Sequence, residues 1–244
     1  MPRVLGCLTG FASMNKIYAM LVDVLKGTKE PVILDIGAHF GQDSFTLRQL
    51  FRDARLWSFE PDPRNIYRLH QQGIKNISTL VEAAIGDQDG TAVMNLSNGT
   101  PPADSNLRNA LTAKTPWSQS SSLKKPKEHL KDVPWVKFDK TSNVTVMKLD
   151  TFFAREKLDR IDVIWADVQG AEDQMIAGGQ HALANTRYLY TEYDDREVYE
   201  GQLSLKEIMK RLPGKWIVLE DFGYDALIRN AAFDLAGNRV AAKT

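Results

Sequence analysis

The chain has 244 residues, 43% of them hydrophobic, and its 31 lysines and arginines balance its 31 aspartates and glutamates. This length and composition allow one sizeable core, so we expect a single α/β domain over residues 1–244. The zero net charge argues against a nucleic-acid partner, because nucleic-acid enzymes usually carry a basic face.

Cys7 is the single cysteine, which excludes a disulfide framework or a cysteine-rich metal site within one chain. A reducing, cytoplasmic location fits best. Only six residues precede Cys7, too few for a signal peptide, and no apolar run reaches the roughly 18 residues that span a bilayer. We therefore expect a soluble protein without a membrane partner, and its oligomeric state stays open.

Hydrophobic periodicity divides the chain into alternating helices and strands. Residues 1–29 form a helical extension in which Ser13 is the expected N-cap and Gly27 the stop. The expected strands are 31–37, 56–59, 78–85, 161–167 and 188–193, and the expected helices are 45–52, 63–71, 151–157, 172–185 and 203–212. Asp150 is the expected cap of the helix at 151–157.

Several other segments also carry strand patterns. Residues 91–96 are expected to form an edge strand or part of a hairpin, and residues 135–138 and 144–149 alternate like a hairpin. The last two strands, 216–219 and 225–229, are too close for a parallel crossover and must be antiparallel. The chain thus predicts a Rossmann-like, mostly parallel sheet of seven strands with a C-terminal antiparallel hairpin.

Between residues 97 and 132 the periodic pattern dissolves into Gly, Pro, Ser, Asn and Lys. A segment that long in a compact domain is usually a functional lid or a disordered excursion. We favour an insertion that covers the substrate side as a lid. Its lysines, 124, 125, 127 and 131, could attract an anionic substrate or could simply keep the loop soluble.

The most informative motif is Val32–Ser44, a buried strand that runs into a glycine turn and then a helix. Dinucleotide-binding turns place a glycine where His39 stands, to make room for a diphosphate. A side chain at this position suits S-adenosylmethionine (SAM), which has no diphosphate. The cofactor-side candidates in this motif are Asp35, Gly37, Ala38, His39, Gly41, Asp43 and Ser44.

Asp35 and Glu60 are the two candidate cofactor carboxylates. Asp35 ends the first strand, where it could attract the ammonium of SAM, and Glu60 ends the second strand beside Pro61, where it could accept from ribose hydroxyls. The alternative is that Asp35 caps a helix and Glu60 is a solvated strand end. After the third strand, Glu82, Ala83 and Ala84 are the adenine-side candidates, although the alanines could equally be close-packing residues.

Seven segments in the same order resemble the FkbM-type methyltransferases, a SAM-dependent family of mostly O-methylating enzymes. The segments are 34–41, 59–61, 82–90, 120–123, 144–150, 161–162 and 167–172. The resemblance implies the class I methyltransferase fold and a SAM pocket lined by Asp35, Gly37, Ala38, Gly41 and Glu60. The family usually has glutamate where this chain has Gln169, which casts doubt on any role that requires a carboxylate there.

Methylation of a hydroxyl requires a group that removes its proton, either a base or a metal ion. Asp167 and Glu192 end neighbouring strands at the ligand-binding edge, where they could line the pocket, hold Mg²⁺ or make structural hydrogen bonds. His129, near the expected lid, is the best histidine for a base. These three are the catalytic candidates, and the metal ligands stay unknown.

The leading hypothesis is therefore a SAM-dependent methyltransferase acting on an oxygen of a small molecule or glycan. An NAD(P)-dependent oxidoreductase explains Glu60 equally well but explains neither His39 nor the closing hairpin. A catalytically silent SAM-binding protein is the third hypothesis, motivated by Gln169.

Overall fold

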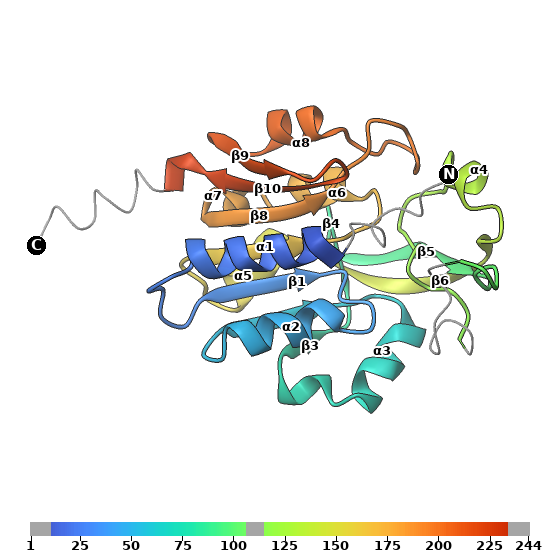
Figure 1. The fold of residues 1–244 in the computed structure, drawn as a ribbon, viewed down its shortest axis with the longest axis horizontal. Helices are drawn as coiled ribbons and strands as arrows, with labels where there is room; N and C mark the ends of the chain where they lie inside the picture. The colour runs from blue at the N-terminus through green and yellow to red at the C-terminus, as the bar shows by residue number, and fades with distance from the viewer. Residues whose placement is uncertain (1–10, 106–114, 234–244) are drawn as a thin grey trace, which may run out of the picture.

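A seven-stranded sheet forms the middle layer of the protein in a computed structural model that describes residues 11–105 and 115–233 (Figure 1). In spatial order its strands are β3 (Thr79–Val81), β2 (Arg55–Phe59), β1 (Val32–Ile36), β7 (Ile161–Ala166), β8 (Thr186–Glu192), β10 (Asp225–Asn230) and β9 (Trp216–Asp221). The first five strands in this order pair in parallel, and β10 is antiparallel to both of its neighbours, β8 and β9. This confirms the expected sheet and its C-terminal hairpin.

Helices cover both faces of this sheet because its strands alternate their side chains between two apolar cores. Ile33 of β1 belongs to the core under α1 (Phe11–Val24) and α2 (Gln42–Leu50), whereas Leu34 belongs to the core on the other face. The helices packed on that second face are α5 (Leu149–Arg155), α6 (Glu172–Ala177), α7 (Gln180–Ala184) and α8 (Leu205–Arg211). A further helix, α3 (Pro63–Gln71), has the predicted bounds and is followed by the 3₁₀ turn η1 (Ile74–Asn76).

A second sheet of three strands lies beside the main one, in the order β4 (Ala84–Gly86), β6 (Lys137–Lys148) and β5 (Gly90–Asn98). It corrects two predictions. The strand expected at 78–85 divides between the two sheets, because the chain turns at Glu82, where Ala83 N–H donates to the Val81 carbonyl. The hairpin expected over 135–149 is instead one strand, whose polar middle pairs with β5 in a ladder exposed to solvent.

Two helix predictions also need correction. The helix expected at 172–185 divides into α6 and α7 at Gly178 and Gly179. Gly178 packs closely on β4, where a Cβ would lie 1.9 Å from the Gly86 carbonyl oxygen. Asp150 does not cap its own helix α5; its carboxylate accepts from the N–H groups of His181 and Ala182 at the start of α7. Ser13 lies inside α1, which begins at Phe11.

The segment after β5 returns along the second sheet. Ser122 pairs with Asn95 of β5 through two backbone hydrogen bonds, and the segment then reaches the short helix α4 (His129–Asp132). Residues 106–114, in the middle of the expected lid, lie outside the described residues. None of the described helices is both long and apolar enough to cross a membrane.

Candidate active site

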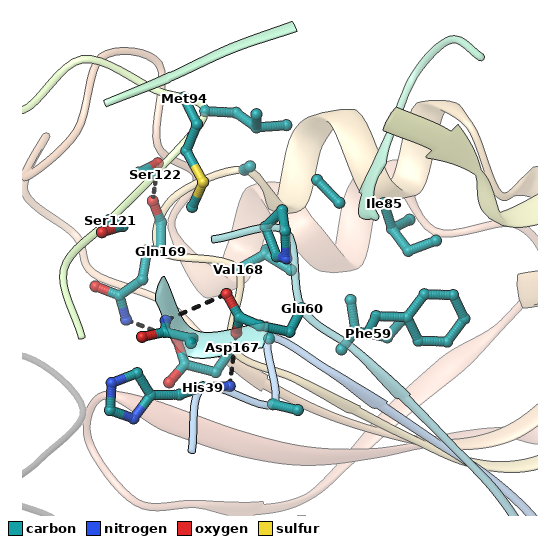
Figure 2. A pocket seen from close by; sticks show the side chains of 18 of the residues that line it. His39, Phe59, Glu60, Ile85, Met94, Ser121, Ser122, Asp167, Val168 and Gln169 are labelled. Carbon is teal, nitrogen blue, oxygen red and sulfur yellow. Dashed lines mark hydrogen bonds between the residues drawn. The ribbon is translucent and has the colours of Figure 1, made fainter. Parts of the chain in front are cut away.

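The main cavity opens at the carboxyl ends of β1, β2 and β7, where the segment of residues 117–123 faces them. We call this segment the strap. Ligands of open parallel sheets bind at this edge. Figure 2 shows His39, Asp167 and Gln169 on one side of the cavity, with Phe59 and Ile85 on the other.

The turn after β1 is shaped by a close approach to β7. A Cβ on Gly37, whose φ is 96°, would lie 1.9 Å from the backbone oxygen of Asp167, so only glycine fits. The next residues then bring the turn over β2: the N–H groups of Gly37 and Ala38 both donate to the Phe59 carbonyl. Gly41, in contrast, lies outside the cavity lining, where a Cβ would press on Leu69.

His39 completes this turn in a left-handed conformation, with φ of 49°. Its backbone N–H donates to Glu60 Oε2 at 2.7 Å, and its Nε2 lies 2.9 Å from Ser118 Oγ on the strap. Burial, together with the charges of Arg68 and Arg64, lowers the pKa of His39 to about 3. The side chain is therefore a neutral hydrogen-bonding link and not a proton acceptor at neutral pH.

Glu60 is buried at the end of β2 and keeps part of its accepting capacity. Oε1 accepts from Asp62 N–H and Asn65 Nδ2, and Oε2 accepts from His39 N–H. A carboxylate has about four acceptor sites, so about one remains on Oε2. Burial and the charge of Asp62 raise the pKa of Glu60 to about 8, because they outweigh the three donors, which lower it.

Asn65, on α3, is a cavity residue that the sequence analysis missed. Its side chain is buried, and its Nδ2 donates to Glu60 Oε1. The other polar atom of the amide is Oδ1. Within the described residues this oxygen has no hydrogen-bond partner. A buried acceptor without a partner is costly, and it favours a ligand that donates a hydrogen bond here.

Asp35 lies beneath the cavity instead of lining it. Its carboxylate accepts a hydrogen bond from Ser44 Oγ, which continues to Ser58 and Ser78 in a buried chain of hydroxyls. Burial and the neighbouring Asp43 raise the pKa of Asp35 to about 8. Asp43 does line the cavity, and burial raises its pKa to about 6.

The strand ends of β7 and β8 bring Asp167 and Glu192 together, as the sequence predicts. Asp167 lines the cavity, Glu192 lies behind it, and Gln169 Nε2 donates to both at 2.6 and 3.1 Å. Burial raises the pKa of both carboxyls, and the charge of Asp167 raises that of Glu192 further. The pair therefore holds a proton more readily than either isolated group.

The far wall of the cavity is apolar. Ala83 and Ala84 lie here as expected, but Glu82 points outward to an ion pair with His70. Further apolar lining residues, which the sequence did not single out, are Phe59, Ile85, Met94 and Leu123. This wall offers a flat ring a surface without charged groups.

The strap forms the remaining wall and is tied to the sheet edge. Ser122 Oγ donates to the Gln169 carbonyl at 2.7 Å, and Ser121 Oγ donates to Asp62 at 3.1 Å. Of the four lysines that follow the strap, Lys124 pairs with Asp173 and Lys127 with Glu197. No lysine or arginine lines the cavity within the described residues.

His129 is separated from the cavity. It is buried between the rings of Phe138 and Tyr199, and burial lowers its pKa to about 4. Of the predicted site residues, nine line the cavity: Gly37, Ala38, His39, Asp43, Glu60, Pro61, Ala83, Ala84 and Asp167. Six do not: Asp35, Gly41, Ser44, Glu82, His129 and Glu192.

The described part of the chain contains no group of three or more His, Cys, Asp or Glu side chains arranged to hold a metal ion. We therefore do not assign Asp167 or Glu192 as metal ligands.

The sheet order and this cavity agree with the comparison to known families, in which the FkbM methyltransferase domain matches residues 35–226. The chain belongs to the FkbM methyltransferase family. Membership makes it a methyltransferase for which SAM is the implied cofactor, and it decides against the NAD(P) hypothesis.

The chain is similar to the 2-O-methyltransferase NoeI of Sinorhizobium fredii (strain NBRC 101917 / NGR234). It is 39% identical over 222 residues, which cover 89% of this chain and 86% of NoeI.

Solved structures also resemble the chain. Monomeric WbdD is 10% identical, with a TM-score of 0.47 over 90% of this chain and 40% of WbdD. The precorrin-6y C5,15-methyltransferase of Geobacter metallireducens GS-15 is 12% identical, with a TM-score of 0.41 over 87% and 84% of the two chains. Likeness at this level says nothing about substrate.

Proposed function

We propose that this protein transfers the methyl group of SAM to a hydroxyl oxygen of a small molecule or glycan. The observation that carries the proposal is the cavity at the sheet edge, whose lining brings together Glu60, Asn65 and Asp167. The likeness to a 2-O-methyltransferase supports oxygen as the target.

The lining residues fit SAM in three places. Glu60 Oε2 keeps about one acceptor site for a ribose hydroxyl. Asn65 Oδ1, which has no partner within the described residues, is covered in this structure, and we propose that the side chain turns to accept from the second hydroxyl. Ala83, Ala84 and the apolar residues beside them suit the adenine ring. We propose that Asp43, in the first turn of α2 and in the cavity lining, receives the ammonium in place of Asp35.

When bound, SAM supplies an electrophilic methyl carbon and a neutral thioether as leaving group. The chain's task is to align the acceptor oxygen, exclude water and take the hydroxyl proton. We assign the proton to Asp167, because it lines the cavity and its raised pKa makes it a stronger base than an exposed aspartate. With SAM held at Asp43, Glu60 and Asn65, its methyl group would pass to the acceptor oxygen, and Asp167 would take the hydroxyl proton.

We further propose that the acceptor carries no anionic group near the methylated hydroxyl. The cavity lining offers Asp43, Glu60 and Asp167 but no described lysine or arginine. An acidic sugar would meet like charges without a counter-ion, whereas the hydroxyl and amide groups of the strap suit a neutral polyol.

Labelled SAM tests the proposal with a panel of methyl glycosides of neutral hexoses, the matching uronic acids, and catechols. We expect label in a neutral hydroxyl compound and none in its uronic acid. Asp167→Asn should reduce turnover more than SAM affinity. Label in no member of the panel, or label only on nitrogen, would overturn it.

A cytoplasmic location stays a prediction, and Mg²⁺ stays one of the alternatives for Asp167 and Glu192. Parallel assays in EDTA and in MgCl₂ test the Mg²⁺ alternative; with Asp167 as the base we expect equal rates. A loss in EDTA that Mg²⁺ restores would instead place a cation at the proton-removal step.

A further inference from the structure

Gln169 lines the cavity just after β7, and its side chain makes three hydrogen bonds. Its Nε2 donates to Asp167 Oδ1 at 2.6 Å and to Glu192 Oε2 at 3.1 Å, while its Oε1 lies 3.0 Å from the Tyr199 hydroxyl. Both amide hydrogens and the carbonyl oxygen therefore have partners. In this orientation the amide donates to an oxygen of each carboxyl group and accepts from the tyrosine hydroxyl.

The backbone holds this side chain in place. Gln169 has φ of 50° and its carbonyl accepts from Ser122 Oγ of the strap. At the next residue, a Cβ on Gly170 would lie 2.8 Å from Tyr199, so glycine lets that ring approach. The Tyr199 hydroxyl also lies 3.0 Å from the Ser120 carbonyl. Gln169 thus joins the strap, Tyr199 and the two strand ends.

The surroundings show what a neutral donor contributes at this position in this chain. The charges of Asp225 and Glu172 raise the pKa of Glu192. In turn, the charge of Asp167 raises the pKa of the nearby acids and phenols, which are Asp35, Asp43, Glu172, Asp225, Tyr190 and Tyr199. Two adjacent buried carboxyls cannot both ionise cheaply, so one of them keeps a proton. An amide with two N–H groups can stabilise one carboxylate without adding a further charge.

We propose that Gln169 is a positioning residue that holds Asp167 and Glu192 side by side as a proton-sharing pair facing the acceptor hydroxyl. The inference rests on the proposed function and deepens it. The hydroxyl proton goes to Asp167, the shared proton stays between Asp167 and Glu192, and the extra proton leaves to solvent after the product is released. Gln169 itself gains and loses no proton.

A reciprocal exchange of the two side chains provides the sharpest kinetic test. Gln169→Glu removes both amide donors and adds a third carboxyl, and Glu192→Gln removes one member of the pair. We expect each to lower kcat roughly 10- to 100-fold, with the Kd for SAM changed less than about threefold. The double variant Gln169→Glu with Glu192→Gln restores two carboxyls and one amide, so it should recover at least about tenfold over the product of the two losses.

The matched control is Gln49→Glu, an exposed position on α2, which should leave kcat unchanged. The assay uses the panel compound that the wild type methylates fastest. The inference would be overturned if the loss of kcat in the double variant equalled the product of the two single losses, or if the single variants changed only KM. Circular dichroism of each variant separates these results from misfolding.

Infrared difference spectra between pH 6 and pH 9 test the pair without any acceptor. We expect a buried protonated-carboxyl band that disappears in Glu192→Gln and shifts in Gln169→Met, which keeps the side-chain volume but loses the amide. A band unchanged in both variants would overturn the inference even if methylation is observed. If no panel compound is methylated, the proposed function fails, and the spectra alone decide whether the pair exists.

Discussion

The hydroxyl of Tyr18 donates a hydrogen bond to the carboxylate of Asp43, which joins the N-terminal helix α1 to the first turn of α2 at the cavity. The Tyr18 ring stacks on Trp165 of β7, with 5.2 Å between ring centroids. Helix α1 precedes the residues 35–226 that define the family match. The helical extension therefore contributes to the site as well as to the core.

Replacing Tyr18 with phenylalanine keeps the stacking and removes the hydrogen bond. Because this bond lowers the pKa of Asp43 against its burial, its loss raises that pKa above about 6. We expect SAM affinity at pH 7 to fall by about 1 kcal/mol, roughly fivefold, and to recover as the pH rises. Calorimetry at pH 6.5 and 8.5 checks this; an equal loss at both values would contradict it.

Asn65→Leu removes the Oδ1 acceptor beside Glu60, together with the Nδ2 donor to Glu60 Oε1, while keeping the volume of the side chain. We expect SAM affinity to fall by about 1 kcal/mol, because one ribose hydroxyl loses its partner. The control ligand is methylthioadenosine, which has the same ribose but no amino-acid end, and it should lose the same amount. Unchanged affinity for both ligands would place the ribose elsewhere.

Glu60→Ala should cost on the order of 1.5 to 3 kcal/mol of SAM binding, since it removes a charged acceptor. In the wild type the pKa of Glu60 is about 8, and a bound hydroxyl donor favours the ionised form. SAM affinity should thus rise from pH 6.5 to 8.5 with release of protons, and Glu60→Ala should reduce that release. Calorimetry in two buffers of different ionisation enthalpy measures the protons released.

The ligand-free protein should lose stability as the pH rises from 7 to 9. Burial raises the pKa of Asp35, Glu60 and Glu172 to about 8, so the folded state binds protons that the unfolded chain has already lost. A raised folded-state pKa gives stability that is present at low pH and is lost through about pH 8. Thermal unfolding should give a lower Tm at pH 9, and Asp35→Asn should lessen the decrease. A Tm that is flat or rising over this interval would contradict the expectation.

Asp150→Ala should destabilise the fold by about 1 kcal/mol, because the carboxylate caps α7 from another element. For a chain of this size, the corresponding decrease in Tm is about 2–4 °C. Asp159→Ala is the control, since that side chain is 85% exposed and its nearest cationic partner, Arg160, lies 3.9 Å away. Equal effects of the two substitutions would argue against the cap.

The sequence by itself determined the main sheet, its closing hairpin and the position of Glu60 in the cavity lining at the end of β2. These follow from local signals: buried strands read as apolar runs, Gly37 permits one tight turn, and short connections force antiparallel pairing. Asp167 and Glu192 were predicted to be neighbours for the same reason, because the ends of parallel strands meet at one edge.

Only the tertiary structure decided which of these side chains face the cavity. Asp35 turns toward Ser44, Glu82 turns toward His70, and His129 lies between the rings of Phe138 and Tyr199. Each of these contacts joins two elements, so the pattern within either element does not predict it. The division of residues 78–85 between two sheets depends on β6, more than fifty residues later. Gln169, read from the sequence as a lost charge, proves to be the hydrogen-bond donor between two buried acids, because pairing among distant groups is set by packing and not by local pattern.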